Sequence, residues 1–596
     1  MNWYVKSIEE QLSEEGKHFL QSIYEPKVVL HPLSHAYHSL CVTDDGEIRV
    51  YGIRSVREGE GEDITRIADY ADPKRAYEGV YHASRDGGIS WQLHRANPKV
   101  LGHAFKNPRT GRWMVAHVGY EYGTNPYITV DYSDIGPDDE HYHSVRVNIR
   151  SVCHRPPLFL TKKNRVIISA QCQNQDAKSP SDNHACMHIS DDNGESWKTV
   201  HLSPAPRFVP EPPHKGPRWE NPGLEPSVAE LSDGTLLCML RTSQDFFYAS
   251  YSYDHGDSWT VPAPTPFHGV LTNPYLFTLN DGRLLWIFNN TKPLPEEDLG
   301  KVFPPLDPDT AAGVWEDVFT NRDANCVAIS EDDGASFLGF REMARNEIRN
   351  TCDFRTSGGN ASGNDKSVHQ FQAVELPFGK VLVHYGQHDR LARVCIFDTR
   401  WLYETARRND LRQGMDDFST QVYLKSISGG GGNFPGHCAW NRTNGVVPVP
   451  DPSGDRSEVL FMRNTADPVL YNQQQGVVWN FPASKTGEVT VRMLVRGRGA
   501  RVSLLDFWMN PCDETVADFA DFTTVIAKAD CAGRFTDVTL RYDTVRGQCE
   551  VLLDGAPKAT LPMQAPAPNG LCYLHLSCAT VSGDAEGTLL KYFEKK

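Results

Sequence analysis

Apolar runs alternate with short turns along the first two thirds of the chain. Two apolar runs of strand length on either side of a turn, rich in β-branched or aromatic residues, are typical of a β-hairpin. Six stretches have this form: SLCVTDDGEIRVYG (39–52), GHAFKNPRTGRWMVAHVG (102–119), PLFLTKKNRVIISAQ (157–171), PSVAELSDGTLLCMLR (226–241), PYLFTLNDGRLLWIFN (274–289) and QAVELPFGKVLVHYG (372–386). Most are followed by a further strand, so the pattern predicts six four-stranded units. We expect an all-β fold with a six-bladed β-propeller over residues 25–410.

The two ends of the chain have other patterns. Residues 1–24 carry apolar side chains at helical spacing and predict a helix packed on the rim of the propeller. Residues 411–475 are rich in Gly, Pro, Asp and Asn, as in a linker or the loop-rich edge of a domain. From 476 to 596, apolar and polar residues alternate with period two, which predicts a C-terminal β-sandwich.

A short motif of the form Ser-x-Asp-x-Gly-x-x-aromatic occurs four times. The copies are SRDGGISW (84–91), SDDNGESW (190–197), SYDHGDSW (252–259) and SEDDGASF (330–337). Ser and Asp side chains can bond turn amides, Gly tolerates a positive φ, and the aromatic ring can hold the turn on its neighbour. The motif therefore predicts a structural turn rather than a catalytic one.

Composition restricts the partners. The 596 residues carry a formal charge of −16, which disfavours nucleic acid and anionic membranes. No run approaches the length of a membrane span, and the start lacks a secretory pattern, so we expect a cytoplasmic protein. The 14 cysteines form no CxxC pair and predict buried thiols rather than disulfides or metal ligands. We expect no cofactor and no catalytic metal.

The four motifs resemble the Asp boxes, or BNR repeats, of the sialidase (neuraminidase) superfamily. The stretch NPGLEPSVAELSDGTLLCMLRTSQDFFYASYSYDHGDSW (221–259) is similar to the fourth blade of that family. There a Glu opens the inner strand and an Arg follows, which match Glu225 and Arg241, and Arg322 matches a later pocket arginine. The resemblance implies that these arginines hold a substrate carboxylate while the Glu activates a Tyr nucleophile. The hairpin LRYDTVRGQCEVLLDGAPK also resembles concanavalin-like jelly rolls.

Two positions depart from the family pattern. The first blade, HAYHSLCVTDDG (35–46), has no arginine where sialidases have one. The sixth blade, SVHQFQAVELPFG (367–379), has Gln370 or His369 in place of the usual tyrosine. The resemblance therefore predicts a divergent member rather than an authentic sialidase.

The repeat itself indicates which residues reach the centre of the propeller. Nine positions before the turn residue of each hairpin stand Tyr37, Gly102, Arg155, Glu225, Asn273 and Gln370. Arg155 is a candidate for the missing third arginine, or alternatively pairs with a carboxylate of a neighbouring blade. Tyr37 is a candidate nucleophile activated by Glu225, or alternatively a core tyrosine.

A proton donor is expected in the loop REGEGEDITR (57–66). Sialidases have a carboxylic acid in a loop after the first-blade arginine, and the resemblance implies that Glu60 is the best-spaced candidate general acid here. Clustered carboxylates can also raise one pKa towards neutrality. The competing carboxyl groups are Glu58, Glu62 and Asp63, and a solvated loop is the alternative. The histidines that could reach the cleft are His35, His38, His103, His154, His369 and His388.

These residues predict a glycoside hydrolase that releases a terminal acidic sugar, a sialic, ulosonic or uronic acid, from an oligosaccharide. Its expected substrate-binding residues are Arg241, Arg322, Arg155, His38, Asn273 and Gln370, and its expected catalytic residues are Glu225, Tyr37 and Glu60. One alternative is a polysaccharide lyase in which His38 or Tyr37 abstracts a proton from a uronate. Another is a carbohydrate-binding propeller without activity.

Overall fold

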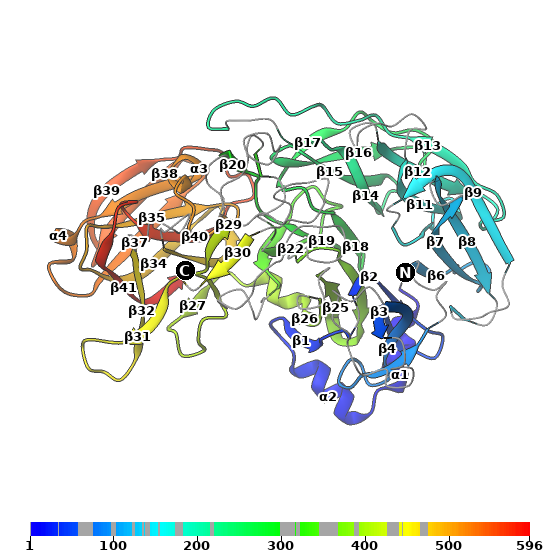
Figure 1. The fold of residues 1–596 in the computed structure, drawn as a ribbon, viewed down its shortest axis with the longest axis horizontal. Coiled ribbons are helices and arrows are strands. Elements are labelled where there is room, and N and C mark those ends of the chain that lie inside the picture. Colours follow the sequence, from blue (N-terminus) through cyan, green and yellow to red (C-terminus); the bar gives the residue numbers. More distant parts are fainter. Residues whose placement is uncertain are drawn as a thin grey trace.

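The computed structural model is almost entirely β-structure (Figure 1). The residues that it describes are 2–33, 35–57, 75–96, 103–121, 125–133, 136–137, 143–152, 155–172, 183–214, 218, 220–297, 316–317, 322, 324–344, 368–386, 392–425, 440–443, 445–464 and 475–596. Among these residues, no helix is both long enough and apolar enough to cross a bilayer. Because nearly all the described elements are strands, the all-β prediction is confirmed.

The six predicted hairpins lie in five sheets. Four sheets have four strands: β2 (His35–Val42), β3 (Ile48–Arg57), β4 (Arg75–Ser84) and β5 (Gln92–Arg95); β14 (Pro222–Glu230), β15 (Leu236–Thr242), β16 (Phe246–Ser252) and β17 (Ala263–His268); β18 (Tyr275–Thr278), β19 (Leu284–Asn289), β22 (Asn325–Ser330) and β23 (Leu338–Glu342); and β1 (Lys27–Leu30), β24 (Gln372–Leu376), β25 (Lys380–Tyr385) and β26 (Arg393–Asp398). The fifth has eight: β6 (His103–Lys106), β7 (Trp113–Glu121), β8 (Asn125–Ser133), β9 (His143–Val152), β10 (Leu158–Leu160), β11 (Arg165–Cys172), β12 (His184–Ser190) and β13 (Lys198–His201). A separate pair is formed by β20 (Leu294–Glu297) and β21 (Glu316–Asp317).

The eight-stranded sheet differs from the six separate units that the sequence predicts. The end of β9 pairs with the end of β11, where Val152 lies opposite Gln171 and Ser151 opposite Cys172. This short pairing joins the second and third hairpin units. The periodicity of the sequence cannot show it, because it depends on how far β9 continues beyond its pairing with β8.

The turn of every predicted hairpin has the backbone conformation that its turn residue allows. The six turn residues all have a positive φ: Gly46, Gly111, Asn164, Gly234, Gly282 and Gly379. Glycine adopts this region without steric cost and Asn more easily than most residues. The six turn positions from which the count along the repeat starts are therefore confirmed.

The four Ser-x-Asp-x-Gly motifs share one set of hydrogen bonds. In the third copy, the Ser252 hydroxyl donates to Asp254 at 2.8 Å, and the Gly256 amide donates to the Ser252 oxygen at 2.7 Å. The Ser258 amide donates to Asp254 at 2.8 Å, and the Trp259 indole donates to the Gly256 carbonyl at 3.2 Å. The Ser, Asp and Gly contacts recur in the other three copies, each of which joins the third and fourth strands of its unit. The predicted structural turn is thus confirmed.

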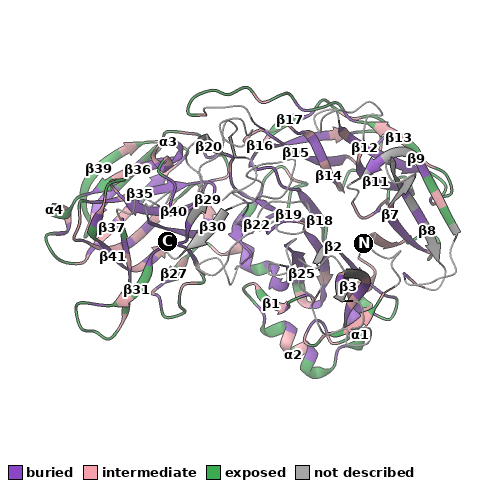
Figure 2. Cartoon of the chain, in the orientation of Figure 1, coloured by how far each residue is buried: buried purple, intermediate pink, exposed green. Residues whose placement is uncertain are grey.

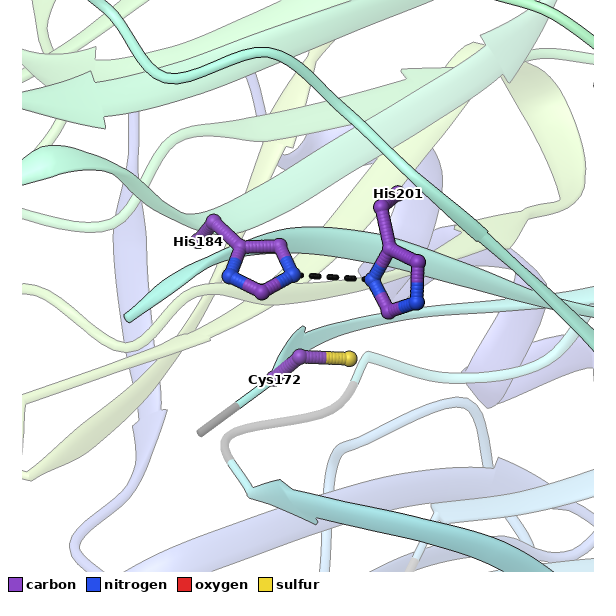
Figure 3. Close-up of side chains that lie close together, drawn as sticks. All are labelled: Cys172, His184 and His201. Atoms are coloured by element: carbon purple, nitrogen blue, oxygen red, sulfur yellow. Dashed lines mark hydrogen bonds between the residues drawn. The ribbon is translucent and has the colours of Figure 1, made fainter. Parts of the chain in front are cut away.

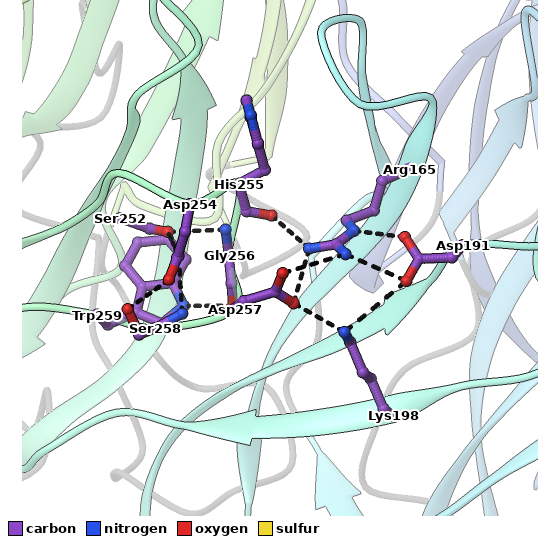
Figure 4. Close-up of polar contacts among 10 residues, drawn as sticks. All are labelled: Arg165, Asp191, Lys198, Ser252, Asp254, His255, Gly256, Asp257, Ser258 and Trp259. Atoms are coloured by element: carbon purple, nitrogen blue, oxygen red, sulfur yellow. Dashed lines mark hydrogen bonds and ion pairs between the residues drawn. The ribbon is translucent and has the colours of Figure 1, made fainter.

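One of these turns is bound to the neighbouring unit by a buried arginine (Figure 4). Arg165 of β11 donates to Asp191 at 2.7 Å, to Asp257 at 3.0 Å and to the His255 carbonyl at 2.9 Å. Lys198 also contacts Asp257 at 2.7 Å. This motif turn therefore stabilises the contact between the third and fourth units.

The first strands of the six hairpins surround one cavity of about 430 Å³. Its walls come from β2, β6, β10, β14, β18 and β24, and Arg155, Gln372 and Tyr275 contribute polar groups. Residues at the start of the chain also line this cavity. The Asn2 side chain holds them there by donating to Glu375 at 2.6 Å. Six segments far apart in the sequence thus meet at one centre.

The N-terminal segment forms two helices instead of the single predicted one. These are α1 (Tyr4–Gln11) and α2 (Glu14–Ser22). The break falls at Ser13, whose hydroxyl accepts from the Gly16 amide at 3.1 Å and caps the second helix. Ile8 and Leu20 are buried against strands of the first and sixth units, as expected for a rim helix. Short helical turns elsewhere are η4 (Pro377–Gly379), η5 (Thr399–Tyr403), α3 (Val516–Phe519) and α4 (Lys528–Cys531).

Two further sheets make up the C-terminal part (Figure 1). One contains β27 (Arg407–Asn409), β31 (Val447–Pro450), β32 (Glu458–Asn464), β34 (Thr486–Val495), β37 (Thr536–Asp543), β38 (Gln548–Leu553), β39 (Ala556–Pro562) and β41 (Asp584–Lys595). The other contains β28 (Phe418–Ser419), β33 (Gly476–Ser484), β35 (Ala500–Leu505), β36 (Phe522–Ile526) and β40 (Leu571–Cys578), and β29 (Val422–Lys425) pairs with β30 (Trp440–Thr443). Several of these strands fall in the stretch 411–475, which the sequence suggested as a linker or loop-rich edge.

The two C-terminal sheets share a hydrophobic core, to which β33, β34 and β41 all contribute. A second core joins this part to the hairpin sheets, where Trp286 and Phe340 pack in one cluster with Trp508 and Tyr573. The Trp508 amide also donates to the Asn290 carbonyl at 2.7 Å. In Figure 2 the buried residues lie mainly in the strands and the exposed ones mainly in loops at the edge of the molecule.

Candidate functional site

The strongest polar contact among the predicted site residues joins Glu225 to Arg241. Glu225 lies in β14, where a register shift between Leu224 and Ser227 interrupts the pairing with β15. Its φ of 49° is left-handed, which is uncommon for a residue with a side chain. Arg241 lies opposite Leu224 on β15, and its guanidinium donates to the Glu225 carboxylate at 2.7 Å. The irregular backbone thus turns the carboxylate towards the arginine.

The electrostatic environment keeps Glu225 ionised. Both side chains of the pair are only 12% exposed. Burial alone would raise the pKa of Glu225, but the charges of Arg241 and Arg155, the hydrogen bond from Arg241 and the nearby His369 lower it to about 2. One carboxylate therefore lies among two guanidinium groups, and their summed charge is positive.

Arg155 connects this pair to the central cavity. It is half-buried at the cavity wall, and its backbone amide donates to the Ser169 carbonyl at 2.9 Å. Burial raises the pKa of Tyr275, and the charge of Arg155 opposes that rise. The Tyr275 oxygen also accepts from the Ala373 amide at 3.1 Å. Arg155 thus lies within electrostatic reach of both Glu225 and Tyr275.

Asn273 and Gln370 lie side by side, although 97 residues separate them. The Gln370 amide donates to the Asn273 side-chain oxygen at 2.9 Å, and the Asn273 amide group donates to Gln370 at 3.4 Å. Gln370 has a φ of 67°, the second left-handed residue among the positions that the repeat places at the centre. The predicted convergence of the fifth and sixth units is therefore observed.

Arg322 contacts the two segments that carry these residues. Its side chain is 2% exposed and donates to the Leu271 carbonyl, two residues before Asn273. Its own carbonyl accepts from the Val368 amide at 3.2 Å, next to His369. The structure thus gives Arg322 a contact that holds the Asn273 segment, in addition to the substrate contact that the resemblance implies.

Three predicted residues are not placed. The backbone of β2 includes Tyr37 and His38, but their side chains lie outside the described residues, and Glu60 lies outside them altogether. The nucleophile, the general acid and the role of His38 therefore stay predictions.

Tyr275 is a candidate that the sequence analysis missed. The count along the repeat selected Asn273, whereas the hydroxyl that interacts with the charge of Arg155 belongs to Tyr275, two residues later. Alternate residues of an extended chain share a face. A check of residues at alternate positions would have found it. Among the histidines whose side chains the structure describes, His369 has a charge interaction with Glu225.

Comparison with protein-family models places residues 137–354 in the family described as "BNR repeat-like domain". The match confirms the resemblance of the repeated turns to BNR repeats. A comparison with curated proteins finds no significant match.

Several solved structures are similar at low identity. A Dyadobacter fermentans protein of unknown function is 18% identical, with 63% of this chain and 97% of that chain covered and a TM-score of 0.37. Trypanosoma rangeli sialidase in complex with 2,3-difluorosialic acid is 11% identical, with coverages of 94% and 91% and a TM-score of 0.35. The NanB sialidase of Streptococcus pneumoniae is 12% identical, with coverages of 66% and 73% and a TM-score of 0.38. All three TM-scores are low.

Proposed function

We propose that the chain is a sialidase-like glycoside hydrolase that releases a terminal acidic sugar from an oligosaccharide. The observation that carries this proposal is the group formed by Glu225, Arg241 and Arg155, whose summed charge is positive in a chain of net charge −16. Within the described part of the chain, Nε of Arg241 has no hydrogen-bond partner although it is buried. A buried donor of this kind is suited to a carboxylate.

In the proposed reaction each group has one task. Arg241 and Arg155, with Arg322, hold the sugar carboxylate, and Asn273 with Gln370 bonds the sugar hydroxyls. Glu225 is ionised at neutral pH and accepts the proton of the attacking group, either water or Tyr37. Glu60 protonates the leaving oxygen.

The low pKa of Glu225 makes it a weak base until the substrate is bound. A pKa of about 2 is poorly matched to proton abstraction near neutrality. A bound carboxylate would offset the charge of the two arginines, and the pKa of Glu225 would rise towards its ordinary value. An acidic sugar thus activates the base that acts on it, whereas a neutral sugar would not.

The fold proposed for this site is a six-bladed propeller followed by a concanavalin-like sandwich. The support is that the first strands of all six hairpins line one cavity and that the two C-terminal sheets share a core. In this proposal the pairing of β9 with β11 is a contact between the second and third blades.

The second candidate is an acidic-sugar-binding protein without activity. It is favoured by the same ion pair, because Arg241 bonds the Glu225 carboxylate directly and lowers its basicity. Both candidates predict an acidic ligand and differ only in turnover.

The test uses fluorogenic glycosides of sialic, ulosonic and uronic acids, with neutral glycosides as the comparison set. We expect release of the fluorophore from one acidic class, with at least about a 100-fold loss of kcat in Glu225→Gln and no change in the exposed control Glu211→Gln. Binding of an acidic sugar without release, lost in Arg155→Met, would support the second candidate. An unsaturated product would support the lyase, and equal action on neutral and acidic glycosides would contradict the proposal.

A further inference from the structure

A cluster of sulfur and nitrogen ligands lies on one face of the sheet formed by β11, β12 and β13. Cys172 of β11 lies opposite His184 of β12, and Cys186 of β12 lies opposite His201 of β13. Because side chains alternate along a strand, His184, Cys186 and His188 share a face, and their partners across the ladder share it too. Three adjacent strands thus bring five side chains that can bind metal to one face of the sheet.

Three of these ligands meet at the open end of the face (Figure 3). Nε2 of His184 lies 2.8 Å from Nδ1 of His201. The ligand atoms of Cys172, His184 and His201 all lie within 4.8 Å of one another. In Figure 3 the two rings lie side by side with one nitrogen of each pointing towards the other, and the Cys172 sulfur lies below them.

The burial of the three residues decreases towards solvent. Cys172 is buried, His184 is half-buried and His201 is exposed. An ion from solvent would meet the two rings first and the sulfur last.

Cys172 also forms a disulfide with Cys186, which corrects the expectation that the cysteines are all free thiols. A disulfide sulfur is not a thiolate, and only the thiolate is a good metal ligand. The bond and a metal ion therefore exclude each other at Cys172. The sequence alone indicates neither the disulfide nor the metal site, because the side chains come from three strands and lie close together only in the observed strand register.

We propose that, once this disulfide is reduced, Cys172, His184 and His201 bind one Zn²⁺ ion and leave its fourth position open to water. A thiolate and two imidazoles are the ligand types that zinc prefers, and three protein ligands with one open position are typical of a zinc site that is accessible to solvent. Two nitrogen ligands on tetrahedral zinc stand about 3.3 Å apart. The rings therefore need to separate by roughly half an ångström from their hydrogen-bonded distance.

The reduction is a thiol–disulfide exchange with a dithiol reductant. The dithiol supplies two electrons and two protons, its own sulfurs form a disulfide, and Cys172 and Cys186 become thiols. Zinc then binds the Cys172 sulfur and the thiol proton passes to water. The freed Cys186 thiol lies beside His188, with Sγ at 3.8 Å from Nε2. The site is thus a redox-dependent one, closed in the oxidised chain and open in the reduced chain.

The experiment titrates the full chain with Co²⁺, which reports thiolate ligation by a charge-transfer band, and with Zn²⁺ followed by dialysis and elemental analysis. We expect one ion per chain in the reduced protein and none in the oxidised protein. Cys186→Ser should bind one ion without reductant, because Cys172 then has no disulfide partner. Cys186→Ala repeats the test in case the serine variant is unstable.

Variants of the ligands separate the site from nonspecific binding. Cys172→Ser should abolish the charge-transfer band, and His201→Ala should weaken binding by at least about 10-fold, since changes in the outer shell alone cost 10- to 100-fold. The exposed control His18→Ala should bind like the parent. Equal binding by Cys186→Ser and Cys172→Ser, or full binding by His201→Ala, would overturn the proposal. Since no glycoside is involved, this result is independent of the proposed hydrolase activity.

Discussion

The ionised state of Glu225 has a measurable effect on stability, which Glu225→Gln isolates. Glutamine keeps the shape of the side chain and its left-handed backbone conformation but removes the charge that Arg241 bonds at 2.7 Å. It therefore mimics a protonated Glu225 at every pH.

The magnitude follows from the pKa. Glu225 has a pKa of about 2, compared with 4.5 for an ordinary glutamate. This difference of about 2.5 corresponds to roughly 3 kcal/mol, at about 1.4 kcal/mol per pKa unit. Because the folded-state pKa is the lower one, the stabilisation is fully present above the unfolded pKa and is lost as the pH falls towards about 2.

Urea unfolding followed by tryptophan fluorescence measures the effect. We expect Glu225→Gln to lower the free energy of unfolding by roughly 3 kcal/mol near neutral pH, and by about 2 kcal/mol at a pH of about 3.5. The matched control is Glu211→Gln, an exposed position, which should change stability by less than about 0.5 kcal/mol. A difference that is absent at neutral pH, or that does not shrink in acid, would refute the ion pair as the cause of the low pKa.

Two buried cations outside the site give further predictions. Lys380 and Asp398 are both fully buried and form an ion pair, and Arg400 contacts the same carboxylate at 2.6 Å. Lys380→Met should therefore cost about 2 kcal/mol by removing one of two cations from Asp398, and adding Asp398→Asn should recover part of the loss in a double-mutant cycle. Recovery absent from the double variant would show that the pair does not act as a unit. Arg165→Met should cost about 2 kcal/mol, because it removes the guanidinium hydrogen bonds to Asp191, Asp257 and the His255 carbonyl and leaves only Lys198 beside the two carboxylates. Thermal melting should show the loss, and ligand binding should be unchanged. An unaltered melting temperature would contradict the role given to this contact between units.

The sequence predicted those features that depend on local chemistry. The six turn residues have the positive φ that a hairpin register requires, and the Ser-x-Asp-x-Gly motifs make the hydrogen bonds that their side chains allow. Glu225 and Arg241 meet because they close the two ends of one hairpin, so a spacing of sixteen residues was sufficient.

Features that depend on the register between distant segments were not predicted. The disulfide of Cys172 with Cys186 needs the diagonal alignment of two strands, and the pairing of β9 with β11 needs the length of β9. Tyr275 was missed because the count along the repeat selects one residue per unit, whereas alternate positions of a strand share a face. Tyr37 and Glu60 stay predictions.

The aromatic cluster that joins the hairpin sheets to the C-terminal sheets determines how the chain can be divided. Trp286 and Phe340 pack with Trp508 and Tyr573, and all four side chains are at most 2% exposed. A fragment cut near residue 410 would present these rings to water and tend to aggregate. Deletion studies of the C-terminal part would therefore report lost solubility rather than a lost recognition function, and single substitutions are the better way to separate its role from that of the site.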